Sequence, residues 1–263
     1  MLSGCLVRLW TRGDGTHHRS LNLYGPRALA EPPSPLCVSR MPRLLFSERL
    51  RPITGLKGEE YLKAFLDIIL GHHIAWTNGG IYHCDLNLTN TVYRKEGGKV
   101  CGVLYDFDLV STDFKSHDYT ERLERTGTLP YMTLDLLRAR YLNISSPHLY
   151  RHDLEAFYWM LVWTCSCIVD GKEDTEGQRM EFGTWRKGDY RACHARKLQW
   201  EGGGPYYWEQ LVQPSQMALW IIAKQWAGDH ILRQRIEIVR LRSKGLKEPY
   251  EADPSATCWD RQP

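Results

Sequence analysis

The 263-residue sequence predicts an α+β fold that is mainly α-helical. Three observations predict this class. Residues 57–77 carry apolar side chains at helical spacing, residues 91–105 hold two strand-like runs around a Gly-Gly turn, and residues 151–169 are apolar on every side. These patterns indicate an amphipathic helix, a β-hairpin and a buried helix. The 43% of hydrophobic residues and the scattered charges are typical of a folded globular protein.

Composition divides the chain into three parts. Residues 1–42 include a proline-rich stretch that neither a helix nor a central strand accommodates, so we predict a poorly ordered leader or linker. We place one domain at 43–247 and a tail at 248–263. Gly13 and Gly15 form only a short GxG pattern, which favours a plain turn over a phosphate loop.

The domain is expected to begin with a short buried strand at residues 43–47 and then the helix at 57–77. The apolar stripe of this helix contains five large side chains: Leu62, Phe65, Leu66, Ile69 and Leu70. The pair Gly79-Gly80 is expected to end the helix, because glycine favours the conformation of a C-terminal cap.

The second half of the domain is expected to be organised by the buried helix at 151–169. Asp153 stands at its start, where a carboxylate can cap the unpaired backbone amides. Residues 171–205 are polar and glycine-rich, so we predict an excursion on the surface. Two helices are predicted to follow at about 214–227 and 229–243, and the arginines of the second indicate a solvated face.

Charge and apolar runs argue against two classes of partner. The net charge of +3 is too weak a basic balance to indicate nucleic acid. No apolar run reaches the roughly 18 residues that a membrane helix requires, and the first residues lack the features of a secretory signal. The eight cysteines are spread singly, apart from Cys165 and Cys167, which indicates reduced thiols. We therefore expect an intracellular protein, cytoplasmic or nuclear, without a nucleic-acid or membrane partner.

Candidate functional residues gather in the stretch IYHCDLNLTNTVYRKEGGKVCGVLYDFDLV. Asp85 and Asn90 stand five residues apart, and Asp106 follows sixteen residues later. The predicted hairpin brings its two ends together, so Asn90 and Asp106 are expected side by side with Asp85 at the same edge. Phosphoryl transfer needs a carboxylate to accept a proton and oxygen ligands for magnesium, and these residues supply both. A polar turn, which Asp and Asn favour by themselves, is the alternative interpretation.

Four motifs in order, HCDLNLTN, YDFDLV, RTGTLPYM and HDLEAFYWMLVW, resemble those of the fungal-type protein kinase family, a divergent branch of the protein-kinase-like fold. The resemblance covers about residues 43–170. It implies a kinase-like C-terminal lobe, ATP and Mg²⁺ as cofactors, and a protein substrate phosphorylated on serine or threonine.

The resemblance also implies a role for each matched residue. The catalytic residues implied are the base Asp85 together with His83 and Asn87. The residues implied to bind the nucleotide cofactor are Asn90, Asp106 and Asp108. The residues implied to form the substrate segment and its structural support are Thr126, Gly127, Thr128 and Asp153. Asn90 and Asp106 are the implied magnesium ligands. Cys84 departs from the usual arginine, which is the receptor of a phosphorylated activation loop.

The family's upper lobe has no visible counterpart. The first lysine of the chain is Lys57, and the leader is too short for the sheet that covers the nucleotide. We therefore expect an N-terminal lobe that is absent or severely truncated, and transfer that is crippled as a result. Two alternatives stay open: a small-molecule kinase of the aminoglycoside-phosphotransferase type, and a catalytically silent binding module.

Overall fold

The computed structural model describes most of the predicted domain. The described residues are 50–79, 81–106, 127–144, 146, 148–174, 180–186, 189–202 and 208–228, together with 237, 240–241 and 243–245. The predicted leader, the strand at 43–47, the tail and most of the arginine-rich helix lie outside these residues. The expectation about an N-terminal lobe therefore stays a prediction.

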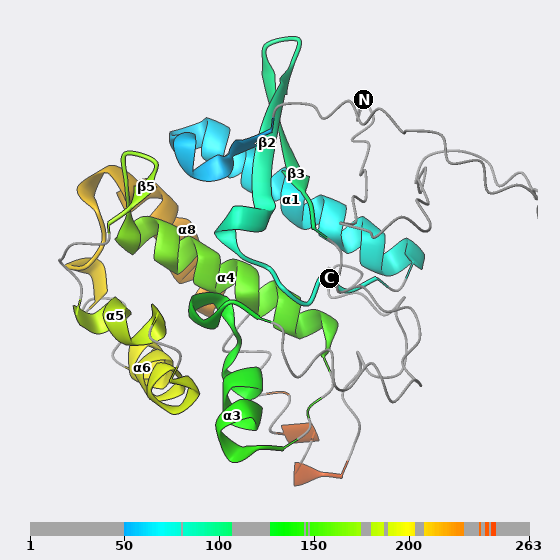
Figure 1. Cartoon of the computed structure of the whole chain (residues 1–263), viewed down its shortest axis with the longest axis vertical. Helices are drawn as coiled ribbons and strands as arrows, with labels where there is room; N and C mark the ends of the chain where they lie inside the picture. Colours follow the sequence, from blue (N-terminus) through cyan, green and yellow to red (C-terminus); the bar gives the residue numbers. More distant parts are fainter. Residues whose placement is uncertain are drawn as a thin grey trace, which may run out of the picture.

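The described part is mainly helical with two small sheets, in agreement with the predicted class (Figure 1). Its α-helices are α1 (Gly58–Gly79), α3 (Leu134–Leu142), α4 (Tyr150–Cys167), α5 (Met180–Arg186), α6 (Tyr190–Gly202) and α8 (Met217–Trp226). Its 3₁₀ helices are η1 (Ile53–Gly55), η2 (Leu88–Asn90), η3 (Leu129–Tyr131) and η4 (Pro214–Gln216). Its strands are β1 (Arg51–Pro52), β2 (Thr91–Glu96), β3 (Lys99–Leu104), β4 (Ile168–Val169) and β5 (Lys172–Glu173).

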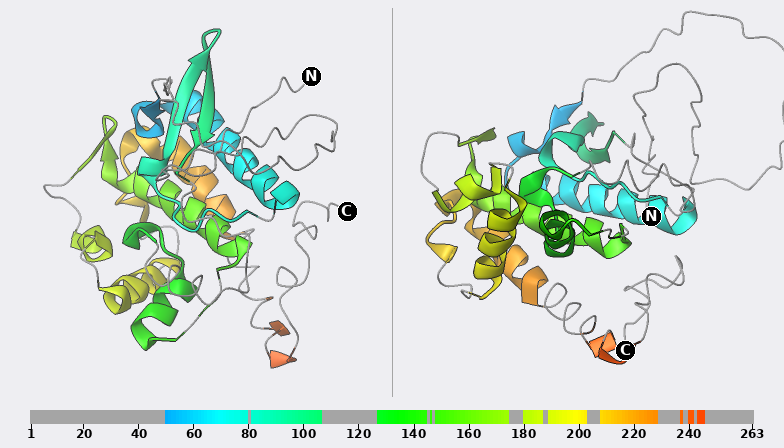
Figure 2. Two further views of the ribbon diagram at one scale, coloured as in Figure 1. Left: turned by 45° about the vertical axis from the view of Figure 1, so that its right-hand side comes forward. Right: turned by 60° about the horizontal axis from the view of Figure 1, so that its bottom comes forward.

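The hairpin predicted around the Gly-Gly turn is confirmed. β2 and β3 pair antiparallel from Thr91 opposite Leu104 to Glu96 opposite Lys99, and β1 adds to the other edge of β2. Gly97 and Gly98 have φ values of 54° and 79°, as a tight two-residue hairpin turn requires. The turn end projects beyond the helices, and the other end leads to the segment of residues 81–90 between α1 and β2 (Figure 2).

Helix α1 packs directly against β3, and Gly102 makes this possible. A Cβ atom at Gly102 would fall on the carbonyl oxygen of Ala64 and 2.7 Å from its carbonyl carbon. The backbone N–H of Gly102 donates to Asp67 Oδ2 at 3.2 Å. This close approach of helix and strand determines which side of α1 faces the protein.

The apolar stripe predicted for α1 is wrong in part. Leu66 and Leu70 are 54% and 46% exposed, whereas Phe65 is buried. The buried face is instead formed by Tyr61, Ala64, Phe65, Ile68, His72, Ala75 and Trp76. Hydrophobic spacing favours leucines, but the actual face includes a small residue against β3 and a histidine that binds a buried acid. Helix register is therefore set here by close packing and by a polar contact.

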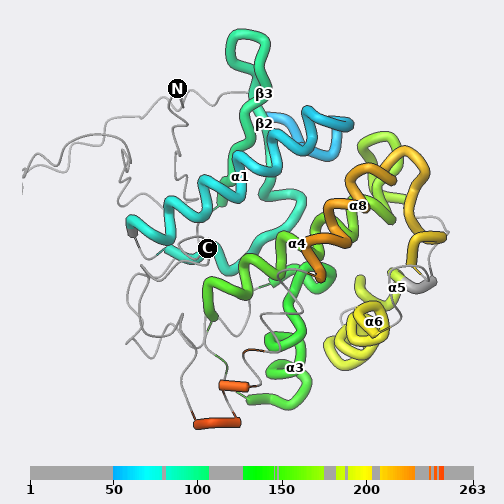
Figure 3. The backbone as a smooth tube through the Cα atoms, turned by 180° about the vertical axis from the view of Figure 1, so that it is seen from behind, coloured from blue at the N-terminus to red at the C-terminus, as the bar shows by residue number. Residues whose placement is uncertain are grey.

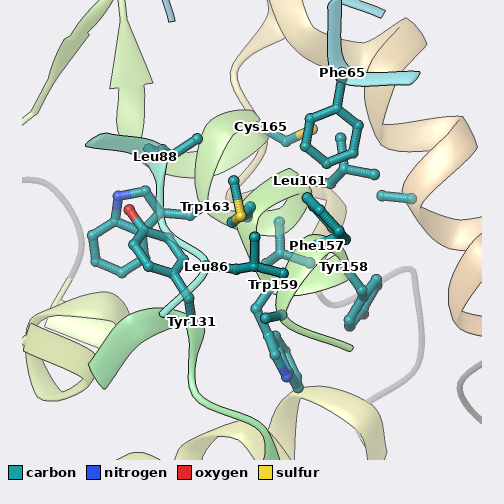
Figure 4. Packing of buried hydrophobic residues seen from close by; sticks show 14 of the residues in the cluster. Phe65, Leu86, Leu88, Tyr131, Phe157, Tyr158, Trp159, Leu161, Trp163 and Cys165 are labelled. Atoms are coloured by element: carbon teal, nitrogen blue, oxygen red, sulfur yellow. The ribbon is translucent and has the colours of Figure 1, made fainter. Parts of the chain in front are cut away.

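Helix α4 forms the centre of the core. Figure 4 shows Phe65 of α1, Leu86 and Leu88 of the segment between α1 and β2, and Tyr131 of η3 around the aromatic side chains of α4. The ring of Phe65 meets that of Phe157 edge to face at 5.8 Å, a favoured geometry for buried aromatic pairs. Helix α8 packs on α4 from the other side (Figure 3). The prediction of a buried helix is confirmed.

Both ends of α4 differ from their predictions. Its N-cap is Leu149, so Asp153 lies one turn inside the helix and the predicted capping role is wrong. The ring of His152 takes over part of that role, because its Nδ1 accepts the backbone N–H of Leu149 at 3.1 Å. At the other end α4 stops at Cys167, and Ile168 and Val169 turn into β4.

The stretch predicted as a surface excursion contains core elements, so that prediction is wrong. Helices α5 and α6 contribute the fully or almost fully buried Phe182, Trp185 and Trp200. Trp185 meets Trp159 of α4 edge to face at 5.4 Å. A few tryptophans among many polar residues leave the average composition polar, although each tryptophan buries a large area. The average composition therefore did not reveal that α5 and α6 belong to the core.

Helix α8 preceded by η4 confirms the helix predicted at about 214–227. Within the described residues, none of the helices combines the length and the apolar character needed to cross a membrane. Within the described residues, Cys101, Cys165 and Cys193 are free thiols.

Candidate active site

The segment between α1 and β2 carries four of the ten predicted site residues, and hydrogen bonds to distant residues hold its backbone. The N–H of His83 donates to Asp153 Oδ2 at 2.9 Å, and His83 Nε2 lies 2.9 Å from the carbonyl oxygen of Tyr105. A carbonyl can only accept, so Nε2 carries the proton. Cys84 follows with φ at 65°, an uncommon conformation for a residue with a side chain. The buried Cys84 packs with Trp76, Tyr82 and Tyr150.

Asn87 organises the next turn. Its Oδ1 accepts the backbone N–H groups of Thr89 and Asn90 at 2.9 and 3.0 Å, which makes it the N-cap of η2. Its Nδ2 donates to the carbonyl oxygen of Asp85 at 3.2 Å. Asn87 is buried and uses these atoms inside the loop, so the structure places it as a support for Asp85 and Asn90.

The end of the hairpin brings Asn90 beside the residue that precedes Asp106. The N–H of Tyr105 donates to the carbonyl oxygen of Asn90 at 3.2 Å. The side-chain Nδ2 of Asn90 donates to the carbonyl oxygen of Asp85 at 3.1 Å. The structure therefore brings Asn90 into contact with Asp85 and places the residue before Asp106 next to Asn90. Asp106 is half-buried with φ at 67°, so the chain turns sharply there.

The side-chain oxygens of Asn90 and Asp106 are of the kind that binds a magnesium ion. Because the Nδ2 of Asn90 is bound to Asp85, the amide is oriented and its Oδ1 points the other way. A carboxylate oxygen of Asp106 and this amide oxygen are the hard ligands that Mg²⁺ prefers, completed in most sites by water and phosphate oxygens. The described residues hold no group of three or more His, Cys, Asp or Glu side chains suited to a metal ion.

The carboxylate of Asp85 is held by a segment 43 residues away. Thr128 donates both its backbone N–H and its hydroxyl to Asp85 Oδ1, at 3.0 and 3.1 Å. Gly127 has φ at 130° and a Cβ there would lie 2.9 Å from Met132 Cγ, so glycine suits both the conformation and the space. Thr128 thus contacts the predicted base, and Gly127 directly precedes Thr128. Thr126 and Asp108 lie outside the described residues.

Asp153 is the buried anchor beneath the loop. Its Oδ1 accepts from His148 Nε2 at 2.7 Å, and its Oδ2 accepts from His72 Nε2 at 2.8 Å and from the N–H of His83. Burial acts to raise the pKa of Asp153, but the two histidines outweigh it and hold the pKa well below the usual range. The carboxylate therefore stays ionised and connects α1, α4 and the segment between α1 and β2.

Burial lowers the pKa of His83 below its ordinary value, against the opposing effects of the Tyr105 carbonyl and of Asp153. The neutral ring donates to the strand end that leads to Asp106. His83 therefore holds the residue before Asp106 in place through this hydrogen bond.

Sequence reasoning missed His72 and its role in this network. The signal available was its place on α1, in helical register with the buried Ile68 and Trp76. A histidine at an otherwise apolar position has to find a buried partner. Only the fold could identify that partner as Asp153, which is 81 residues away.

A comparison with protein families matches residues 27–165 to a model described as "Fungal protein kinase", which spans more than half of the chain. No curated protein and no solved structure matches the chain.

Proposed function

Because the chain belongs to the fungal protein kinase family, we propose that it transfers the γ-phosphoryl group of ATP to a serine or threonine hydroxyl of a protein substrate. The observation that carries this proposal is that three residues, from the segment of Asp85 itself and from residues 127–128, hold Asp85 at both its backbone and its side chain. Asn87 and Asn90 hold its carbonyl oxygen, and Thr128 holds its carboxylate.

Asp85 is the proposed general base. Its Oδ1 is occupied by Thr128, so the other carboxylate oxygen is the one that accepts the proton of the attacking hydroxyl. The substrate oxygen forms a bond to the γ-phosphorus while the bond from this phosphorus to the β,γ-bridging oxygen breaks, and ADP leaves. The protein contributes position and charge, since such a transfer requires little covalent chemistry from the enzyme.

Asn90 and Asp106 are the residues that would hold Mg²⁺. When bound, the ion neutralises the phosphate oxygens and the charge that develops on the leaving group. The orientation of the Asn90 amide by Asp85 supports this assignment, because it places the metal ligand and the base on one loop.

The contact between Thr128 and Asp85 favours a polypeptide over a small molecule as acceptor. Residues 127–128 present backbone next to the proposed base, where an extended substrate segment can align. A phosphotransferase for small molecules has no need of such a segment.

The experiment compares the full chain with its Asp85→Asn variant on a panel of proteins, peptides, sugars and antibiotics, with γ-labelled ATP. We expect labelled serine or threonine in polypeptides and a rate lower by about two to four orders of magnitude in D85N, the usual worth of a positioned base. Asp170→Asn is the matched control, because Asp170 lies exposed in the turn between β4 and β5. An unchanged rate in D85N, or label found only on small molecules, would overturn the proposal.

A further inference from the structure

A lysine is completely buried beneath the segment that reaches Asp85. Lys197 of α6 is 0% exposed, and its Nζ donates to the carbonyl oxygen of Met132 at 2.6 Å. The same ammonium lies over the ring of Trp159, 4.3 Å from its centroid, and 5.1 Å from that of Trp185. Both aromatic faces attract a cation and replace part of the hydration that burial removes.

A buried acid holds the same segment two residues further along. Glu155 of α4 accepts the backbone N–H of Leu134 at 2.9 Å through Oε1. This oxygen also accepts the indole N–H of Trp159 at 2.9 Å, and the face of that indole lies under Lys197. Lys197, Trp159 and Glu155 thus form a clamp that grips a carbonyl and an N–H on either side of Thr133.

The clamp is connected to Asp85 through η3. The N–H groups of Tyr131 and Met132 donate to the carbonyl oxygen of Thr128 at 2.8 and 3.2 Å. Thr128 in turn donates twice to Asp85. A shift of Met132 therefore moves the two donors that orient the carboxylate.

A buried ammonium costs more than an apolar side chain of the same length, which would fill the space without desolvating a charge. The lysine is therefore explained by what its charge and donor do. We propose that Lys197 is a positioning residue, which acts through the Met132 carbonyl and Thr128 to hold Asp85 in its working orientation. This inference rests on the proposed kinase function and extends it to a residue on α6.

The activity test replaces Lys197 by Met, which keeps the length of the side chain and removes the charge. We expect kcat to fall about 100-fold, the effect of a misplacement of about 1 Å at a reacting group, while the KM for ATP changes less than about twofold. Arg196→Met is the matched control, since it removes an exposed cation from the same helix. A loss below about threefold in K197M would overturn the proposal.

A double-mutant cycle with Thr128→Val separates positioning from a general loss of structure. If Lys197 acts through Thr128, the K197M substitution costs less than about tenfold once the threonine hydroxyl is gone, because coupled residues are not additive. The same 100-fold loss in both backgrounds would contradict this route. Lys197→Arg retains the charge and stacks on tryptophan, so we expect a kcat within about tenfold of the wild type. A folded K197R that loses as much as K197M would count against the proposal.

Hydrogen exchange tests the clamp without any activity. We expect faster exchange in peptides covering residues 127–134 of K197M, with the hairpin and α4 unchanged, and no change in R196M. Unaltered exchange in that segment would refute the clamp. A wild-type chain that transfers no phosphate would instead refute the proposed function, and the exchange result would still decide the role of Lys197.

Discussion

Replacing Asp153 by Asn tests the buried network that supports the segment between α1 and β2, which carries Asp85 and Asn90. The change removes one charge and almost no volume. Asp153 is 1% exposed and accepts from His148 through one oxygen, and from His72 and the His83 N–H through the other. Asn has a single acceptor oxygen, and its NH₂ group must face one of these donors.

The geometry decides which way the asparagine turns. A backbone N–H cannot become an acceptor, so the amide oxygen has to stay toward His83 and His72. The NH₂ group then faces His148, whose Nε2 can accept only after its ring changes tautomer. Two bonds survive in the weaker neutral form, and the third is lost or reversed.

These changes give the expected magnitude. A hydrogen bond to a charged group contributes about 1.5–3 kcal/mol, and a neutral one about half as much, so D153N should lose about 3 kcal/mol of unfolding free energy. With a urea slope of about 2 kcal/mol/M, the unfolding midpoint falls by about 1.5 M. Asp170→Asn is the control, because Asp170 pairs with Lys57 while both side chains are exposed, and its midpoint should barely move.

The pH dependence provides a second check. The pKa of Asp153 is lowered in the folded protein, so the unfolded state takes up the proton first as the pH falls. Its contribution to stability is present above the unfolded value of about 3.9 and is lost as the pH falls through the folded value. The difference between wild type and D153N should therefore shrink below about pH 4. A D153N midpoint within about 0.3 M of the wild type at pH 7 would refute the reasoning, because about 0.6 kcal/mol is less than a typical hydrogen bond.

Two further predictions concern α1. Gly102→Ala should destabilise the protein by several kcal/mol, because the new methyl group meets the backbone of Ala64, which cannot give way like a side-chain tip. Thermal unfolding of G102A and of Gly183→Ala measures this, since nothing lies within 4 Å of a Cβ at Gly183; equal midpoints would contradict the close approach. Phe65→Ala should cost about 3–5 kcal/mol, whereas Leu66→Ala should cost less than about 1 kcal/mol, because Phe65 is buried and Leu66 is mostly exposed. Urea titrations that rank the two variants the other way would show that the register of the helix is wrong.

The features that the sequence determined are local. The Gly97-Gly98 turn between β-forming runs specifies the hairpin, and a hairpin necessarily joins its ends, so the meeting of Asn90 with the residue before Asp106 followed from chain order. The all-round apolar pattern of residues 151–169 likewise predicted a buried helix, because apolar side chains on every face exclude a position at the solvated surface. Short-range geometry and solvent exclusion suffice for such statements.

The tertiary structure decided every choice that depends on a distant partner. The contact of Ala64 with Gly102 determines which face of α1 is buried. The spacing of the leucines had predicted a different face, which includes the exposed Leu66 and Leu70. Asp153 does not cap α4 as predicted but accepts hydrogen bonds from donors that lie up to 81 residues away. A buried carboxylate is stabilised only where several donors converge. The burial of Lys197 also depends on distant partners. On a polar helix a lysine predicts a solvated surface, and only the tryptophans and the Met132 carbonyl that surround it in the fold turn the position into part of the core.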